Sequence, residues 1–516
     1  MHLRGSVKVH KLVSNKTSLS LFHALHQPPT CESTESTLAG IRPHSPIQLN
    51  DDVLLNVFKI YGLDIRDEEE EEEKFRFVGK WDRQRWWYNL AHVSKGWRSL
   101  IFASQVQLDL HLLCTYGVPV ADMLACSPSL PLTIFYNEGD REMTEEDEEG
   151  VLVALSLSNC HRVRRIALAS NLGKLITAID KAFPVLERVC IGSRAEGSTH
   201  LVFPDTFHAP NLRHWTASIG HPLLTNTAAL VNLELIDIPA SSNFPPSYIP
   251  TRILLMPQLE TLVVHFRSPL PNPDVEREPS NTPIAAQSLL RLHLVSFRGD
   301  STYLEGLIAR ISAPILSVLD VLLSDRLVSI VSPRLLQFIQ TSENLRFSAA
   351  QITFGGDVVD FMAVSDQSGW KHPPLHLRIG TLSRGLWQVM TVVQVFRTLS
   401  PMLSVVEKLA LGRIGHEQLY EWHNDAARIQ WRKIFRAFSG VKTLCVPSIL
   451  VEELSLSLCS EGGEMPLELF PNLLELQYFG GSGIGEAFTR FINEREAAGH
   501  PVRLVRDSSP TCDGSI

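Results

Sequence analysis

The sequence predicts an α/β protein in which a short N-terminal module of three helices is followed by an irregular solenoid of repeated coils. Three observations support this fold class. The chain has 516 residues, and a single core stops growing at roughly 250 to 300 residues unless the architecture is a repeat. Helical patterns follow one another closely between residues 50 and 103. From about residue 105, short apolar strands recur at a regular period.

Composition excludes several classes of partner. Apolar residues make up 44% of the chain and charged residues 20%, which is ordinary for a globular protein. The formal net charge of −9 comes in good part from two acidic runs, so no basic surface for nucleic acid is predicted. No apolar run approaches the roughly 18 to 20 residues that a membrane-spanning helix needs. We therefore expect a soluble protein of the cytoplasm or nucleus, without nucleic acid or membrane as a partner.

The metal-ligating residue types do not form a recognisable site. The 8 cysteines are widely scattered, without a C-x-x-C pair, and are expected to be mostly buried thiols in a reducing compartment. His416, Glu417 and His423 lack the H-E-x-x-H spacing of a zinc site. We expect neither a metal nor a cofactor.

Residues 1–45 are predicted to be a disordered tail, because they lack periodicity and hold many Ser, Thr, Pro and His residues. The first thirty residues are basic and serine-rich, with no acidic residue before Glu32, as in mitochondrial transit peptides. A plain basic tail is the favoured interpretation, and a targeting signal is the alternative.

Residues 46–104 are predicted to form the helical module. Asn50 or Asp51 can cap a first helix, after which apolar residues recur at helical spacing. A second helical stretch is expected over residues 81–91, and Ser94 is a good N-cap for a third helix.

Two acidic runs are interpreted as local structure. The six glutamates of residues 68–73 repel one another and predict a solvated loop inserted into the helical module. The run at residues 144–150 begins with Thr144, a capping residue. It is predicted to be the polar start of a helix rather than a calcium loop.

Residues 105–516 are predicted to be the solenoid. Its unit is an apolar residue followed by two others, three and five positions later, and the triplets begin at Val163, Leu186, Leu212, Leu233, Leu259, Leu289, Leu316, Val406, Val441 and Leu473. In the first run the triplets begin about 21 to 30 residues apart, close to the leucine-rich repeat period of 20 to 29. Proline stands just before several strands, where it ends the preceding helix. Each coil is expected to bury its triplet against neighbouring coils, so that no coil is stable alone.

The repeat pattern is interrupted twice, at residues 346–402 and 412–438. Both stretches are longer than one coil needs. The second has a helical pattern with Trp431, Ile434, Phe435 and Phe438 on one apolar stripe. Most triplets also lack the asparagine that closes a leucine-rich repeat, so we expect an irregular solenoid.

A glycine-rich turn is the nearest approach to an enzyme motif. Gly481, Gly483 and Gly485 lie between a strand-like and a helical pattern, but they are one residue short of the dinucleotide-binding G-x-G-x-x-G. A last solenoid coil is the favoured interpretation. No catalytic residue is predicted, and we expect that the chain is not an enzyme.

Two motifs within residues 46–102 resemble the F-box. Val93-Ser94-Lys95-Gly96-Trp97-Arg98-Ser99-Leu100 closely matches V-S-[KR]-x-W-R-x-L, the end of that motif. Asp52-Val53-Leu54 and Val57-Phe58 match its first helix. With the repeats, the whole chain is similar to fungal F-box proteins that carry C-terminal leucine-rich repeats. It departs from the pattern at Asn50, where proline is usual, and in the long connection over residues 63–80, whose lengthening costs only about 0.6 kcal/mol per doubling.

The resemblance implies a function without chemistry of its own. In that family the F-box docks the Skp-type adaptor of a Skp-cullin-F-box ubiquitin ligase, and the repeats hold a protein target, whose identity the sequence does not predict. The adaptor-binding residues that it implies are Leu49, Val53, Leu54, Val57, Phe58, Val93 and Trp97. The alternative is an interaction scaffold of leucine-rich repeats, with a degenerate F-box that packs against the first coil and no ligase role. In that case Leu49, Val53 and Trp97 would be buried within the chain.

Overall fold

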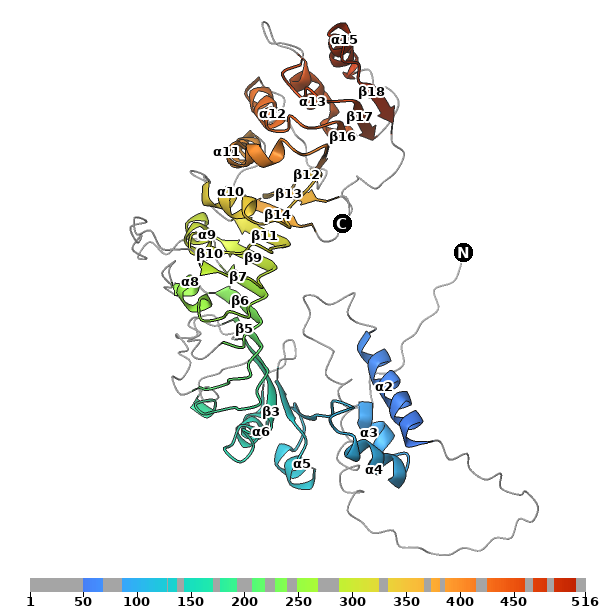
Figure 1. Ribbon diagram of the computed structural model, residues 1–516, viewed down its shortest axis with the longest axis vertical. Helices are drawn as coiled ribbons and strands as arrows, with labels where there is room; N and C mark the ends of the chain where they lie inside the picture. Colours follow the sequence, from blue (N-terminus) through green and yellow to red (C-terminus); the bar gives the residue numbers. More distant parts are fainter. Residues whose placement is uncertain are drawn as a thin grey trace, which may run out of the picture. The chain divides into compact units, whose positions relative to one another are not determined.

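A computed structural model describes residues 50–67, 86–127, 129–136, 143–169, 177–192, 207–218, 228–238, 248–267, 287–323, 333–365, 373–380, 386–413, 425–459, 467–479 and 487–506 (Figure 1). The predicted tail, the glutamate loop, the residues 416–423 considered for zinc and the glycine-rich turn lie outside these ranges. The chain divides into two compact units, Met1–Ala154 and Leu155–Ile516. Each unit is described by itself.

The first unit begins with three helices, α2 (Asp51–Asp67), α3 (Trp86–Ala91) and α4 (Lys95–Ala103). Asn50 caps α2, because its Oδ1 accepts a hydrogen bond of 3.2 Å from the Asp52 backbone N–H. Ser94 caps α4 as the sequence predicts, with its Oγ accepting from the Trp97 backbone N–H at 3.1 Å. Of the second helix, predicted over residues 81–91, the structure describes the part from Trp86 onward, which is α3.

The first unit continues with two strand–helix pairs, β1 (Leu112–Thr115), α5 (Val120–Cys126), β2 (Leu132–Tyr136) and α6 (Glu145–Ala154). Strands β1 and β2 pair in parallel. The Oγ1 of Thr144 accepts from the Asp147 backbone N–H at 3.2 Å, and the Asp147 carboxylate accepts from the Thr144 backbone N–H at 3.0 Å. This reciprocal cap confirms that the second acidic run opens a helix.

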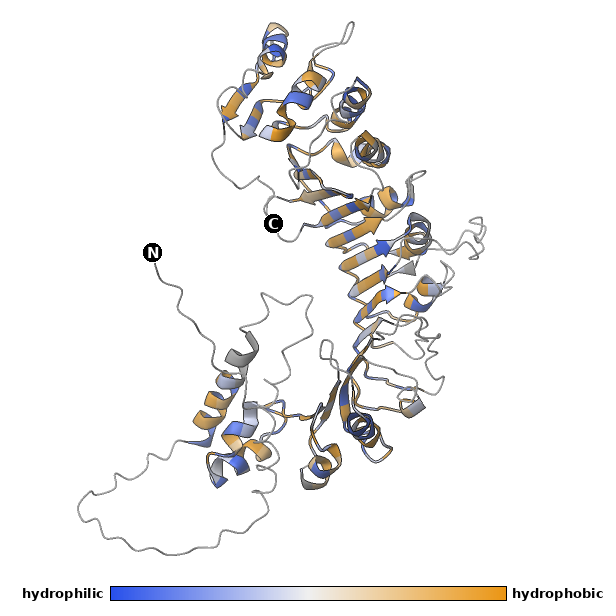
Figure 2. Ribbon diagram, turned by 180° about the vertical axis from the view of Figure 1, so that it is seen from behind, coloured by the Kyte–Doolittle hydropathy of each residue, from blue (hydrophilic) through white to orange (hydrophobic). Residues whose placement is uncertain are grey.

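The second unit starts with a run of parallel strands. They are β3 (Val163–Ala169), β4 (Arg188–Gly192), β5 (His214–Ser218), β6 (Asn232–Ile238), β7 (Thr261–Phe266), β9 (Leu294–Gly299) and β11 (Val318–Leu323), each paired with the next. Helices α8 (Tyr248–Ile253), α9 (Ser301–Ile308) and α10 (Pro333–Gln340) lie between strands in the chain. The short strands β8 (Gln287–Ser288) and β10 (Ile311–Ser312) form a separate parallel pair. Apolar and polar bands alternate along the strands of the sheet (Figure 2).

The C-terminal part of the second unit adds an antiparallel insertion and further coils. The insertion consists of β12 (Ala349–Phe354), β13 (Val358–Val364) and β14 (Leu375–Gly380). The elements that follow are α11 (Leu386–Leu403), β15 (Lys408–Arg413), α12 (Asp425–Ala437), β16 (Thr443–Pro447), η2 (Ser448–Leu450), α13 (Val451–Leu458), β17 (Glu475–Phe479), α15 (Thr489–Ala497) and β18 (Arg503–Arg506). The sheet order is β11-β14-β13-β12-β15-β16-β17-β18. Strand β13 is antiparallel to both of its neighbours, whereas β14 is parallel to β11 and β12 is parallel to β15. The chain is thus an α/β protein with a mostly parallel sheet whose strands alternate with helices.

The predicted triplets form the core of the sheet, with two corrections of register. Val163, Ile166 and Leu168 are buried, as are most members of the other triplets. The coils predicted to begin at Leu233 and Leu289 instead begin three residues earlier and three residues later, at Leu230 and Leu292. Both errors have one cause: Leu230 and Leu233, like Leu289 and Leu292, lie three positions apart, and each of them begins a triplet with the predicted spacing.

The two predicted interruptions have different contents. The first holds the antiparallel insertion and α11. The second holds α12, whose predicted apolar stripe is confirmed. All four of its residues are fully buried, namely Trp431, Ile434, Phe435 and Phe438.

Asparagines that the sequence analysis did not single out connect successive coils. Asn211, Asn344 and Asn472 each lie in the turn before a strand and donate their side-chain N–H to a backbone carbonyl of the preceding coil. The acceptors are Pro184 at 2.6 Å, Ile315 at 2.9 Å and Ser439 at 3.0 Å. Each bond gives a hydrogen-bond partner to a turn carbonyl that lies outside the paired strands.

Two arginines serve the same purpose inside the C-terminal coils. Arg432 is buried and donates to the carbonyls of Ser457 and Cys459 at the end of α13, at 3.2 and 2.5 Å. The guanidinium of Arg495 is also buried, and it donates to carbonyls in the turn before β17. A cation is favoured at a helix C-terminus, because the last carbonyls carry partial negative charge.

Candidate partner-binding surfaces

Helix α2 has an apolar side chain turned inward and an apolar stripe turned outward. Phe58 is only 1% exposed, and its ring lies edge-on against Trp97 of α4 with centroids 4.9 Å apart. On the outer side, Val53, Val57, Ile60 and Tyr61 are 46%, 49%, 58% and 42% exposed. Val57 lies four residues after Val53, and Ile60 and Tyr61 lie three and four residues after Val57, so the four positions lie along one side of the helix. We call Val53, Val57, Ile60 and Tyr61 the α2 stripe.

The structure places the sequence-predicted site residues in three groups. Leu49 lies outside the described residues. Phe58 is buried, and Leu54 and Trp97 are partly buried. Val53, Val57 and Val93 are exposed. Phe58 and Trp97 are thus in direct contact, and together they fix the position of α2 against α4.

Other aromatic residues hold the three helices together. Trp86 and Trp87 of α3 are buried. The Trp86 ring lies 6.3 Å from that of Tyr61, and the Trp87 ring lies 5.7 Å from that of Phe102. Such edge contacts contribute about 0.5 to 1.5 kcal/mol beyond the area that they bury.

Arg98 has a structural role that was not foreseen. Its Nε donates to the Ala91 carbonyl at the end of α3, at 3.0 Å. The general preference for a cation at a helix C-terminus is the signal that could have assigned this role. The last residues of the V-S-K-x-W-R motif therefore brace the module. Tyr61, at the edge of the α2 stripe, packs against Trp86, whereas Val53, Val57 and Ile60 are exposed.

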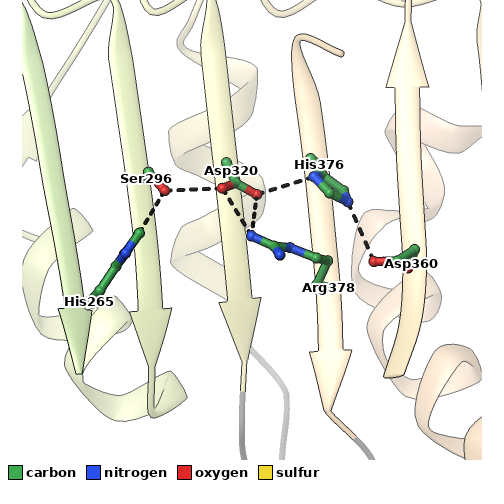
Figure 3. A network of polar contacts seen from close by, with 6 residues as sticks. All are labelled: His265, Ser296, Asp320, Asp360, His376 and Arg378. Atoms are coloured by element: carbon green, nitrogen blue, oxygen red, sulfur yellow. Dashed lines mark hydrogen bonds and ion pairs between the residues drawn. The ribbon is translucent and has the colours of Figure 1, made fainter. Parts of the chain in front are cut away.

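A second candidate surface is polar. It lies on the sheet, across β7, β9, β11, β14 and β13 (Figure 3). His265 Nε2 and Ser296 Oγ are 2.9 Å apart, and Ser296 Oγ donates to Asp320 Oδ2 at 3.0 Å. Arg378 Nη2 donates to both oxygens of the same carboxylate, at 3.3 and 3.2 Å. We call these residues, together with His376 and Asp360, the strand-face network.

His376 connects the two carboxylates of the strand-face network. Its Nδ1 lies 3.2 Å from Asp320 Oδ1, and its Nε2 lies 3.4 Å from Asp360 Oδ1. Burial by itself would lower the pKa of His376, but the bonds to Asp320 and Asp360 outweigh burial and raise it. Burial likewise opposes ionisation of Asp320, yet His376 and Arg378 hold the pKa of its carboxyl below the ordinary value.

The geometry of the strand-face network does not activate Ser296 as a nucleophile. Its hydroxyl proton is directed at Asp320, so His265 must donate to the serine oxygen rather than take its proton. Burial lowers the pKa of His265, which fits a neutral ring. The network is therefore a set of paired charges and fixed dipoles on a strand face. Sequence patterns could not reveal it, because its residues come from five strands.

Within the described ranges, no three His, Cys, Asp or Glu residues are grouped so that they could hold a metal ion. Among the helices of those same ranges, none combines the length and the apolar character needed to cross a membrane. A scan against protein-family models found no match, and a search of curated proteins found none either. The surfaces described above are thus the basis for a proposal about function.

Proposed function

We propose that the chain is a target-recognition adaptor of a Skp-cullin-F-box ubiquitin ligase. In this proposal the α2 stripe and its surroundings bind the Skp-type adaptor, and the strand–helix coils bind the protein to be ubiquitinated. The observation that carries the proposal is the exposure of the α2 stripe on a helix whose other side is anchored by Phe58 against Trp97. This helix and α4 hold the two motifs that resemble the F-box.

The energetics of the α2 stripe favour a covering partner. Burying a Val, Ile or aromatic side chain completely contributes about 1.5 to 3 kcal/mol. The four residues of the stripe are roughly half exposed, so each could contribute on the order of 1 kcal/mol on docking. A contiguous exposed apolar stripe is typical of a protein-binding site.

The exposure of Val53 supports the proposal over its alternative, although Trp97 is partly buried against Phe58 and Leu49 lies outside the described residues. A degenerate module that only packs against the repeats was expected to bury Val53 within the chain. Val53 is instead 46% exposed, and Val93, beside the V-S-K-x-W-R motif, is exposed as well. This supports a docking role for the outer side of α2.

The test is co-purification of the full-length chain with a Skp-type adaptor, using Val57→Asp and a matched control. Val57→Asp places a charge in the centre of the α2 stripe, where a docked partner would leave it buried and unpaired, so adaptor binding should be lost. Val106→Asp makes the same substitution at a highly exposed valine just after α4, outside the stripe, and should leave binding intact.

Two results would contradict the proposal. One is a folded wild-type chain that does not retain the adaptor. The other is equal binding by the Val57→Asp and Val106→Asp variants. Circular dichroism of both variants establishes that each is folded.

A further inference from the structure

Arginines gather around His214 at one end of the sheet in the second unit. Pairing of β3, β4 and β5 brings Arg165, Arg188 and His214 into one row across the three strands. Arg213, the residue before His214, is exposed, as is Arg188. Adjacent strands lie about 4.8 Å apart, so the row spans about 10 Å. We call Arg165, Arg188, Arg213 and His214 the β3–β5 basic row.

The arginines of this row contribute to a lowered pKa of His214. Burial, followed by the charges of Arg188, Arg213 and Arg165, lowers the pKa of His214 to about 4, and Glu187 opposes this only in part. The ring is therefore neutral at physiological pH.

The tautomer of His214 follows from its hydrogen bond with Asn232. Asn232 on β6 donates its side-chain Nδ2–H to His214 Nδ1 at 2.9 Å, so Nδ1 is an acceptor. The remaining proton of the neutral ring is on Nε2, which can donate to a ligand. The basic row thus combines guanidinium groups with a fixed neutral N–H donor.

Among the described residues, two carboxylates on or beside these strands, Glu187 and Glu234, have other partners. Glu187 forms an ion pair with Arg164, whose Nε lies 2.8 Å from Glu187 Oε2. Glu234 accepts from Thr216 Oγ1 at 3.1 Å, and burial raises its pKa. Arg188 and Arg213 are exposed, and Glu187 offsets their effect on His214 only in part.

We propose that the β3–β5 basic row binds the carboxylate side chains of an acidic, extended segment of a partner protein. Carboxylates are the complement of exposed guanidinium groups, which bind them through two parallel N–H donors. The charges are spread along about 10 Å rather than converging on one point. An extended segment that presents several carboxylates matches this spread better than a single compact anion does.

The inference deepens the proposed function, because it assigns a chemical class to the target that the repeats would hold. The measurement nevertheless needs no adaptor protein. Loss of adaptor binding by Val57→Asp and loss of acidic-peptide binding are separate readouts, so either proposal can fail alone.

The experiment uses the full-length chain and a fluorescein-labelled hexaglutamate peptide, with binding followed by fluorescence polarisation. The Arg188→Gln/Arg213→Gln double variant removes two exposed charge contacts and should weaken binding about tenfold. Arg298→Gln neutralises an exposed arginine on β9 of the same sheet, and its affinity should stay within about twofold of wild type. Added salt should weaken the wild-type complex, and a hexaglutamine peptide should not bind.

A second measurement does not depend on the variants. The Nε2–H of His214 should donate to a bound carboxylate, so the imidazole signals of His214, followed by NMR of the wild-type chain at neutral pH, should shift when hexaglutamate is added and stay unchanged with hexaglutamine. Unchanged signals with hexaglutamate overturn the proposal, as does equal weakening by Arg298→Gln. Binding of a phosphoserine peptide without binding of hexaglutamate also overturns it, because a phosphate site would then be indicated.

Discussion

At the scale of residues, the pKa values of two histidines on one sheet are shifted in opposite directions by their neighbours. Burial opposes a charge on both rings. His376 lies between Asp320 and Asp360, which raise its pKa above the ordinary value. His214 lies among arginines, and its pKa falls to about 4. The direction of a histidine's pKa shift on this sheet thus depends on which charged residues the neighbouring strands place beside it.

His376 should make stability depend on pH in a defined direction. Because its pKa in the folded state is raised, its contribution is fully present below the unfolded value of about 6.5 and is lost as pH rises through the folded value. The Asp320 pKa is lowered, so its contribution is present above about 4 and is lost as pH falls. The free energy of unfolding of wild type should therefore exceed that of His376→Gln most clearly between about pH 5 and 6.5.

Urea denaturation of both proteins across pH measures this difference. If the difference in free energy of unfolding between wild type and His376→Gln widens from neutral to alkaline pH, the aspartates do not raise the pKa of His376. His265→Gln is the matched control, because burial lowers the pKa of His265. That substitution should not produce the same profile.

At the scale of elements, residue spacing predicted the strands better than their register. The triplet places apolar residues three and five positions after the first, and Leu292 and Leu230 define two true starts. Leu289 and Leu233 lie three residues away and are also buried. A spacing of three cannot separate two starts that are themselves three residues apart, and only the pairing of neighbouring strands resolves them.

The asparagine bonds between coils should contribute measurably to stability. Asn472→Ala removes the donor to the Ser439 carbonyl, and we expect the free energy of unfolding to fall by about 1 kcal/mol. Asn472→Asp keeps the shape but cannot donate, so it should cost a similar amount. Both are measured by chemical denaturation. Full stability in the aspartate variant would mean that the hydrogen bond is not what matters at this turn.

At the scale of the whole molecule, the sequence predicted the α/β repeat architecture and the helical start, but not the polar surfaces. Period, prolines and apolar triplets are local features, and they are sufficient to indicate a solenoid. The strand-face network and the β3–β5 basic row depend on which strands become neighbours. Asp320 approaches His376 only because the insertion reverses the strand order between β11 and β15, which places β14 rather than β12 beside β11. That reversal has no signature in the residue spacing.

A solenoid transmits damage mainly to adjacent coils, which predicts a spatial pattern of hydrogen exchange. Leu262→Ala opens a cavity in β7 and should destabilise by about 2 to 5 kcal/mol. Amide exchange should accelerate in β6 and β9, which pair with β7, more than in β16 and β17. Val263→Ala, on the opposite side of β7, is the control. Uniform acceleration in all strands would indicate one cooperative unit instead.

The antiparallel insertion leaves strand direction unchanged on its two sides. Because β13 is the reversed member, β14 and β12 both run in the direction of the flanking strands β11 and β15. Without the β12–β13 hairpin, the chain order β11, α10, β14, α11, β15 would be a regular strand–helix alternation. The hairpin is therefore a unit that evolution could have gained, and that a designer could remove, in one step without reversing the polarity of any later coil.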